Sequence, residues 1–192
     1  MELTHEQVQI LRDLKKNVDS DEIRYKEIIK KNLINSDLII YLLNNKELES
    51  MGADPSDYLG VNILPYYLIH PTQHNVQNFI CYDVGFRELE RYNAKIKYLQ
   101  ITFTILCEEK NNIEKKTGIA RHDLLGALIM DIFNWSNLFG EQIHCVSDLP
   151  GVTDNDYSTR TLIFEQRTDN NLTKTRNGTP IIIPRTIGAT ES

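Results

Sequence analysis

The sequence lacks most of the patterns by which enzymes and metalloproteins are recognised. Its nine glycines are dispersed and form neither G-x-x-x-x-G-K nor G-x-G-x-x-G, so no backbone cradle for phosphate is expected. It also contains no G-x-S-x-G, C-x-x-C or H-E-x-x-H motif, which removes the common signatures of a nucleophilic serine and of zinc. We therefore predict no catalytic residues, no cofactor and no metal.

Signals for membranes and secretion are missing as well. No apolar run approaches the roughly 20 residues that span a bilayer. The first residues, MELTHEQVQI, do not combine a basic stretch with an apolar one, so no secretory signal is expected. We expect a protein made in the cytoplasm, with no membrane partner, and its cysteines (Cys81, Cys107 and Cys145) as buried free thiols.

An excess of positive charge is also absent. The formal net charge is −6, which argues against a general nucleic-acid binder, because such proteins normally present a basic face. The same charge suits a protein that lets DNA slide past without trapping it, since an acidic wall repels phosphate.

What the sequence does contain is alternation of apolar and polar residues. Alternation predicts strands over residues 78–86, 96–109, 142–147 and 157–167. An apolar stripe with helical spacing predicts a helix over residues 119–138, with Gly140 just past its end. VNILPYYLIHP is broken by Pro65 and Pro71 and is interpreted as an edge strand or an irregular extended segment. The order of elements predicts an α+β fold, a mostly antiparallel sheet of about four strands with a long helix packed across it.

The N-terminal part is predicted to be helical. Thr4 and Gln7 have capping-box spacing at the start of a helix over residues 4–17. A second start follows at Asp19, and a third is expected near residues 35–37, so that one kinked helix or two helices could form. The residues predicted to face the core of the second helix are Ile23, Ile28, Ile29 and Leu33. We divide the chain into an N-terminal helical extension (1–18), an α+β core (19–167) and an extended C-terminal arm (168–192).

The C-terminal arm is the most unusual segment. It has three basic and two acidic residues, a net charge of +1 that leaves −7 for the rest of the chain, and it contains TPIIIPR at residues 179–185. Pro180 and Pro184 favour an extended backbone, and three exposed isoleucines would forfeit about 1.5–3 kcal/mol each of possible burial. We predict that the arm docks on a neighbouring subunit or partner. The alternative is that it covers an edge of its own sheet.

One enzymatic interpretation is kept as an alternative. Asp83 lies in the first long strand, and Glu108, Glu109 and Lys110 end the second. An aspartate followed by Glu-x-Lys on a neighbouring strand is the pattern of Mg²⁺-dependent PD-(D/E)xK nucleases, in which two carboxylates hold the metal.

Four stretches carry a resemblance to a known class of proteins: ILPYYLIHPTQHNVQNFICYDV, YLQITFTILCEE, TGIARHDLLGALIMDIFNW and SDLPGVTDNDYSTRTLIFEQRT. They resemble small minor structural proteins encoded in phages and prophages of low-GC Gram-positive bacteria. The order of elements over residues 20–168 is similar to that of the tail terminator (tail completion) proteins of long-tailed phages. The N-terminal helix and the arm depart from the compact core of that family.

The resemblance implies a structural protein of the virion neck, not an enzyme. Such proteins form a ring, typically a hexamer, on the head-proximal end of the tail tube. Its partners would be further copies of itself, the tail tube protein and the head connector or stopper protein, with DNA only as cargo passing through the lumen. A head-completion or stopper protein of the adjacent ring is the alternative within the same class.

The predicted subunit contacts are two loops and the arm. We take the half-polar second faces of the long strands (Tyr82, Gln100, Thr102, Thr104) as surfaces that could border a neighbour or the lumen. The loop DLPGVTDNDY and the loop KNNIEKKT are expected at the subunit interface. The residues chosen are Asp154, Asp156, Tyr157, Lys115, Lys116, Lys174, Arg176, Ile181, Ile182, Ile183 and Arg185.

Overall fold

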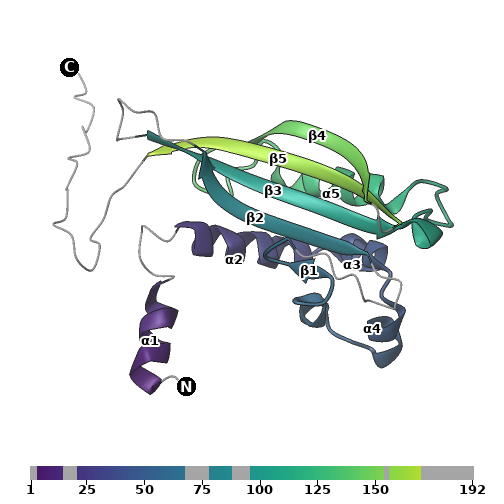
Figure 1. Cartoon of the computed structure of the whole chain (residues 1–192), viewed down its shortest axis with the longest axis horizontal. Coiled ribbons are helices and arrows are strands. Elements are labelled where there is room, and N and C mark those ends of the chain that lie inside the picture. Colours follow the sequence, from purple (N-terminus) through teal and green to yellow (C-terminus); the bar gives the residue numbers. More distant parts are fainter. Residues whose placement is uncertain (1–3, 15–20, 68–77, 88–95, 154–155, 170–192) are drawn as a thin grey trace, which may run out of the picture.

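The computed structural model describes residues 4–14, 21–67, 78–87, 96–153 and 156–169. Within them the chain forms an α+β fold whose five-stranded sheet has the order β1-β2-β3-β5-β4 (Figure 1). Every neighbouring pair is antiparallel except β1 and β2, which are parallel. The strands are β1 (Ile63–Leu64), β2 (Phe79–Arg87), β3 (Ile96–Glu108), β4 (His144–Thr153) and β5 (Tyr157–Asp169). The predicted fold class is confirmed.

Three helices together form the layer that covers one face of the sheet. The helices are α1 (His5–Leu14), α2 (Asp21–Ile34), α3 (Asp37–Leu43), α4 (Lys46–Met51) and α5 (Arg121–Phe133), with 3-10 turns at Pro55–Tyr58 and Glu109–Asn111. Buried side chains of α2, α3 and α5 join the core side of the sheet in one cluster. The covering layer is therefore shared, where the sequence predicted a single long helix.

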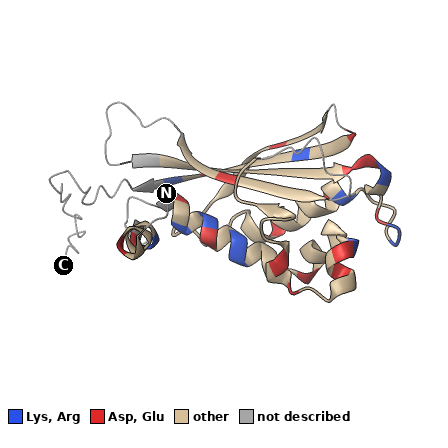
Figure 2. Cartoon of the chain, turned by 60° about the horizontal axis from the view of Figure 1, so that its bottom comes forward, with Lys and Arg blue, Asp and Glu red and all other residues tan. Residues whose placement is uncertain are grey.

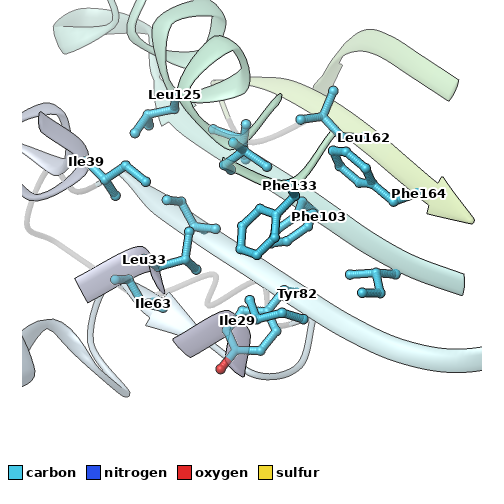
Figure 3. Close-up of a cluster of buried hydrophobic side chains, with 14 of the residues drawn as sticks. Ile29, Leu33, Ile39, Ile63, Tyr82, Phe103, Leu125, Phe133, Leu162 and Phe164 are labelled. Carbon is cyan, nitrogen blue, oxygen red and sulfur yellow. The ribbon is translucent and has the colours of Figure 1, made fainter. Parts of the chain in front are cut away.

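The core forms where the alternation of the strands meets these helices (Figure 3). On β3 the five residues predicted to share a face are all fully buried; they are Leu99, Ile101, Phe103, Ile105 and Cys107. Phe103 contacts Phe133 of α5 and Phe164 of β5, with ring centroids 5.1 and 5.6 Å apart. The prediction for β3 is confirmed, because period-two burial leaves one face of a strand inside the core.

The opposite face of the sheet is mixed. Phe79, Cys81 and Leu106 form a small buried cluster there with Leu64. Thr102 and Thr104 are half-buried on the same face. Tyr82, which the sequence placed among the lumen- or neighbour-facing residues, lies instead in the main core with 2% of its surface exposed. That prediction was wrong, because Tyr82 pairs with Phe103 and directly paired residues point to the same side of a sheet.

The two edges of the sheet differ from the prediction in length. VNILPYY contributes only the two-residue edge strand β1, as its prolines suggested. At the other edge, β4 continues through Asp148–Thr153, which the sequence assigned to a loop. Pro150 lies within β4 opposite Arg160, and the register shifts between Cys145 and Ser147. Proline is tolerated here because an outermost strand has one side free of ladder hydrogen bonds.

Helices α1 and α3 begin at their predicted start signals, whereas the start predicted at Asp19 lies outside the described residues. Thr4 and Gln7 form the reciprocal capping box, with N–H···O distances of 2.9 and 3.2 Å. Ser36 caps α3, so residues 21–43 form two helices and not one kinked helix. In α2 the buried residues include Tyr25, Ile29 and Leu33, whereas Ile23 is 41% exposed. The prediction for Ile23 was wrong because i, i+4, i+8 spacing from Leu33 selects Tyr25.

Two further helix boundaries were wrong. Helix α5 ends at Phe133, five residues before the predicted end, and Asn134 is its C-terminal cap. Gly140 has a φ of 100°, but it belongs to a separate turn. Helix α4 was not predicted from the sequence; the Asn45 side chain caps it and Gly52 ends it in the left-handed conformation.

A buried polar chain joins α4 and β1 to the core. Asn45, Asn62 and Asn78 are at most 2% exposed. The Asn45 amide donates to the Asn62 side-chain oxygen at 2.8 Å, and the Asn62 amide donates to the Asn78 carbonyl at 2.8 Å. The Asn78 amide in turn donates to the carbonyl of Leu42 at 3.1 Å. These bonds fix the connection between the helical half and the first strands.

The cysteines are free thiols. Cys81 and Cys107 are buried, as predicted, but Cys145 is only half-buried on the edge strand. Burial raises the pKa of the Cys107 thiol to about 12, which keeps it protonated and unreactive at neutral pH. The predicted division into extension, core and arm stays a prediction, since residues 15–20 and 170–192 lie outside the described part of the chain.

Candidate subunit interface

The two loops chosen from the sequence meet at one end of the sheet. Tyr157 starts β5 and pairs with both Glu108 of β3 and Thr153 of β4. The backbone N–H of Glu109 donates to the carbonyl of Asp156 at 3.0 Å. The β3–α5 loop and the turn before β5 are therefore neighbours. We call the surface formed by residues 109–120, 153 and 156–157 the loop end.

Glu114 organises the β3–α5 loop. Glu114 is 3% exposed, and its carboxylate accepts the backbone N–H groups of Lys116 (3.0 and 3.1 Å) and Thr117 (2.7 Å). The hydroxyl of Tyr41, from α3, donates to the same carboxylate at 2.9 Å. The burial of Glu114 was not predicted from the sequence. Its signal was an acidic residue shortly before Gly118, where a side chain can close a turn on the following N–H groups.

These hydrogen bonds shift the titration of both partners. The backbone N–H of Lys116 is the largest cause that lowers the pKa of Glu114, to about 2, with further donors on Thr117 and Tyr41 outweighing its burial. The bond to Glu114 raises the pKa of the Tyr41 hydroxyl. The loop is thus built around a carboxylate that stays ionised at any physiological pH.

Acid should loosen this loop. A carboxyl whose folded pKa is lowered contributes stability that is complete above its unfolded pKa of roughly 4.3 and is lost as the pH falls toward about 2. We expect amide exchange of Lys116 and Thr117 to accelerate over that window. In Glu114→Gln the exchange should already be fast at neutral pH and should lose this pH dependence. Equal protection in the two proteins at pH 7 would contradict the assignment; Glu109→Gln, an exposed neighbour, is the control.

The lysines predicted at the interface flank this carboxylate. Lys115 and Lys116 are exposed, and the Lys116 ammonium lies 5.5 Å from the centre of the Tyr41 ring. Asp156 is exposed with a φ of 58°, and Tyr157 is half-buried against Phe79, with ring centroids 6.3 Å apart. The structure therefore brings four of the chosen residues to one surface. The remaining seven lie outside the described residues: Asp154, Lys174, Arg176, Ile181, Ile182, Ile183 and Arg185.

The sequence did not anticipate how apolar the loop end is. Ile113 and Ile119 are 57% and 47% exposed, although their backbone is ordered: the Glu114 N–H donates to the Ile119 carbonyl, and Ile113 pairs with Ala120. Val152, on the adjoining end of β4, is 76% exposed. Exposed aliphatic side chains on ordered backbone are typical of contact surfaces when they gather with polar residues around them.

A groove between α3 and α5 opens beside the loop end. It has a volume of ≈ 310 Å³, and its walls are mostly apolar. Leu38 and Tyr41 stand on its rim with 61% and 43% of their surfaces exposed. Its lining residues are Leu38, Tyr41, Leu42, Glu114, Thr117, Leu124, Ala127, Leu128 and Asp131. We call it the α3–α5 groove.

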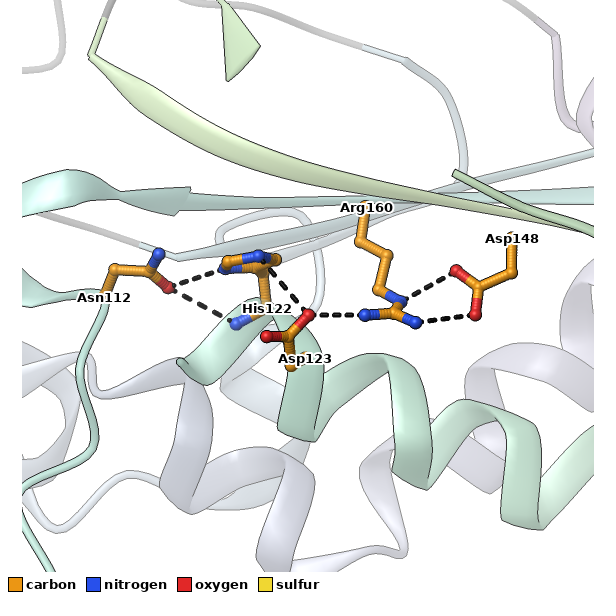
Figure 4. A network of polar contacts seen from close by, with 5 residues as sticks. All are labelled: Asn112, His122, Asp123, Asp148 and Arg160. Carbon is orange, nitrogen blue, oxygen red and sulfur yellow. Dashed lines mark hydrogen bonds and ion pairs between the residues drawn. The ribbon is translucent and has the colours of Figure 1, made fainter. Parts of the chain in front are cut away.

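A charged cluster holds α5 against the edge of the sheet near the loop end (Figure 4). The Arg160 guanidinium donates to both oxygens of Asp148, at 2.8 and 2.6 Å, and also to Asp123 of α5. His122 bridges Asp123 and Asn112, with Nδ1 2.9 Å from the Asn112 oxygen. The bonds to Asp148 are the largest cause that raises the pKa of Arg160. The charged and polar side chains of the cluster bind one another, and these contacts hold α5 in place against the sheet.

Gly126 makes room for this arrangement. A Cβ at residue 126 would lie 2.7 Å from Cδ of Arg160, so any other residue there would require the Arg160 side chain to shift. The cluster was missed in the sequence. The feature of the sequence that indicated it is Arg160, which shares the buried side of β5 with Leu162 and Phe164 because the three are spaced by two residues.

The residues of the nuclease pattern are not brought together. Asp83 pairs with Thr102, six residues from Glu108 along β3, which corresponds to about 20 Å of strand. The carboxylate of Asp83 accepts from Lys26 of α2 at 2.6 Å. Among the described residues, no three His, Cys, Asp or Glu side chains gather in a group that could hold a metal. The geometry does not build the two-carboxylate site on which that alternative depends.

A comparison with protein families identifies the chain. The model of one family, YomW, matches residues 35–166 of the 192. The chain belongs to the YomW family. The matched part begins just before the Ser36 cap of α3 and ends within β5, so it contains the loop end and the α3–α5 groove. The name YomW is that of a gene in a Bacillus prophage region, which associates this YomW-family chain with phages.

No curated protein matches the YomW-family chain. In the part of the chain that the structure describes, no helix combines the length and the apolar character needed to cross a membrane.

Proposed function

We propose that this phage-associated chain is a structural protein of the phage neck, a tail terminator. In this role copies assemble into a ring, six-fold in the resembling family, on the head-proximal end of the tail tube. The ring stops tube growth and presents a surface to the head connector. The chain catalyses nothing in this role, and its work is done by the shape of its contacts.

The observation that carries the proposal is the loop end. Two loops chosen from the sequence lie side by side there, with exposed isoleucines on backbone that Glu114 and Tyr41 hold in place. A contact surface needs this combination, because ordering a loose loop on binding costs free energy that a preformed loop does not. A ring built by head-to-tail contacts uses one such surface at every interface.

Charge supports the DNA-related part of the proposal. The chain carries a net charge of −6. Figure 2 shows charged residues mainly on the helices and around the loop end, with long stretches of strand uncharged. The described residues therefore offer DNA in the lumen no continuous basic track, which favours a strand in transit that is not retained.

The decisive test is assembly of the purified full-length chain. We expect a discrete ring by light scattering and electron microscopy for the wild type. Ile113→Asp combined with Ile119→Asp should shift it to monomers, because four carboxylate oxygens would be buried at each contact without partners. The melting temperature of the monomer should change little, since both side chains are exposed.

Met51→Asp is the matched control, since Met51 is 70% exposed on α4 and belongs to neither loop. It should assemble as the wild type does. A wild-type protein that remains monomeric at all concentrations, with and without tail tubes, would sink the proposal.

Gene deletion separates the terminator from the stopper. Without a terminator, tails should be overlong or should fail to join heads. Normal tails accompanied by heads that leak DNA would instead assign the chain to the stopper ring.

A further inference from the structure

The α3–α5 groove has no occupant among the described residues. The chemistry of its walls indicates what kind of segment would bind there. Its floor is aliphatic, from Leu42, Leu124 and Leu128, and Leu38 and Tyr41 stand exposed on the rim. Asp131, on α5, adds a carboxylate at the side of the groove. An occupant should therefore carry a short row of aliphatic side chains flanked by positive charge.

One segment of this chain has that composition. Ile181, Ile182 and Ile183 stand in a row, with Arg176 before them and Arg185 after them. The C-terminal segment from residue 168 carries +1, against −7 for the rest of the chain. We propose that the α3–α5 groove receives Ile181–Ile183 of a neighbouring copy of this chain, an inference that rests on the proposed ring.

The two prolines decide how the segment binds. Pro180 and Pro184 hold the backbone extended and lack the N–H that a sheet ladder needs. The groove is bounded by two helices, whose backbone groups are already bonded within the helices, so it has no ladder to offer. The segment therefore docks by its side chains. In an extended chain alternate residues point the same way, so Ile181 and Ile183 enter the groove together.

The direction of β5 favours a neighbour over the same copy. β5 has 13 residues; it begins at the loop end with Tyr157 and finishes at Asp169, about 40 Å away at the opposite end of the sheet. The groove adjoins the loop end through Glu114 and Thr117. Ile181 lies twelve residues after Asp169, a stretch that reaches about 40 Å when fully extended.

To enter the groove of its own copy, the segment would therefore need nearly all of that length to return along the sheet. It would need more length to pass over the helical layer. A neighbour that presents its loop end to the opposite end of this sheet places its groove within easy reach. This is the head-to-tail contact that the proposed ring requires.

A disulfide trap tests the contact directly in the full-length chain. Ala127 is exposed within the groove, so Ala127→Cys with Ile183→Cys should form a disulfide on mild oxidation. On a non-reducing gel we expect a ladder of dimers and higher multimers. The matched control pairs Ile183→Cys with Met51→Cys, on α4 and 70% exposed, and should give no ladder. The wild type, with its buried and half-buried thiols, reports the background.

The other two outcomes of the disulfide experiment would contradict the proposed contact. A disulfide confined to monomers would place the segment in its own groove and overturn the neighbour contact. No disulfide, with cysteines that still react with a maleimide, would overturn docking in the groove altogether.

A second variant separates this inference from the ring itself. Ala127→Arg fills the groove at an exposed helical position where arginine is well tolerated. It should raise the concentration needed for assembly at least tenfold, whereas Met51→Arg should not. If the wild type forms a ring and Ala127→Arg assembles equally well, the groove contact is wrong and the proposed function stands. If the wild type itself stays monomeric, both the groove contact and the proposed function are wrong.

Discussion

Phe133→Ala is expected to lower the free energy of unfolding by about 3–5 kcal/mol, the usual cost of removing a buried phenylalanine ring. Phe133 is 1% exposed and ends α5 directly over the sheet. Its ring contacts those of Phe103, Phe139 and Phe164, with centroids 5.1, 6.1 and 6.4 Å away (Figure 3). The cavity left by alanine would open between α5 and two central strands, where neither layer can collapse without disturbing the other.

Urea unfolding followed by circular dichroism measures this change. The midpoint should fall while the dependence on denaturant stays the same, because the extent of surface exposed on unfolding is unaltered. Met51→Ala is the control for loss of apolar volume, since Met51 is 70% exposed, and it should change stability by less than about 0.5 kcal/mol. A Phe133→Ala protein as stable as this control would refute the central role of the aromatic cluster.

Asn62→Leu is expected to destabilise the protein by about 3 kcal/mol, although it puts an apolar residue at a buried position. Asn62 is fully buried, and its side chain joins Asn45 to the carbonyl of Asn78 with two bonds of 2.8 Å. Leucine would leave the Asn45 amide and the Asn78 carbonyl without these partners. Each buried group left unsatisfied costs about 1–3 kcal/mol.

The same unfolding experiment tests Asn62, with Asn137→Leu as its control. Asn137 is exposed, and the same exchange there should have little effect on the free energy of unfolding. Because Asn45 also caps α4, amide exchange of Leu48 should accelerate in Asn62→Leu. A stabilised Asn62→Leu protein would show that the site behaves as ordinary core and that the polar chain is dispensable.

The long strands could be predicted because their signal is local. Alternation in β3 and β5 states which side of each strand is buried, and the register of the structure agrees residue by residue. The second half of β4 could not be found in this way. Leu149, Pro150 and Gly151 look like a loop by composition, and only pairing with Arg160 and its neighbours holds them in a strand.

The candidate site, too, could be predicted only in part from the sequence. The two loops were predicted from composition, because charged and turn-forming residues between apolar segments mark exposed connections. Their adjacency depends on β3 ending opposite the start of β5, which is a matter of strand register. The groove depends on the approach of α3 to α5, and the bond from Tyr41 of α3 to Glu114 of the loop before α5 joins residues 73 apart in the chain.

The sequence by itself determined the period of the long strands, the buried side of β3 and β5, the caps of α1 and α3, and the unusual composition of the C-terminal segment. These properties depend on residues that are close in the sequence and belong to the same helix, strand or turn, so they can be recognised from the local pattern. Only the tertiary structure decided which edges the sheet has, which polar side chains are buried together, and that the loop end and the α3–α5 groove adjoin. Those depend on contacts between distant residues, whose pairing is selected by packing of the whole core and is not written in any one segment.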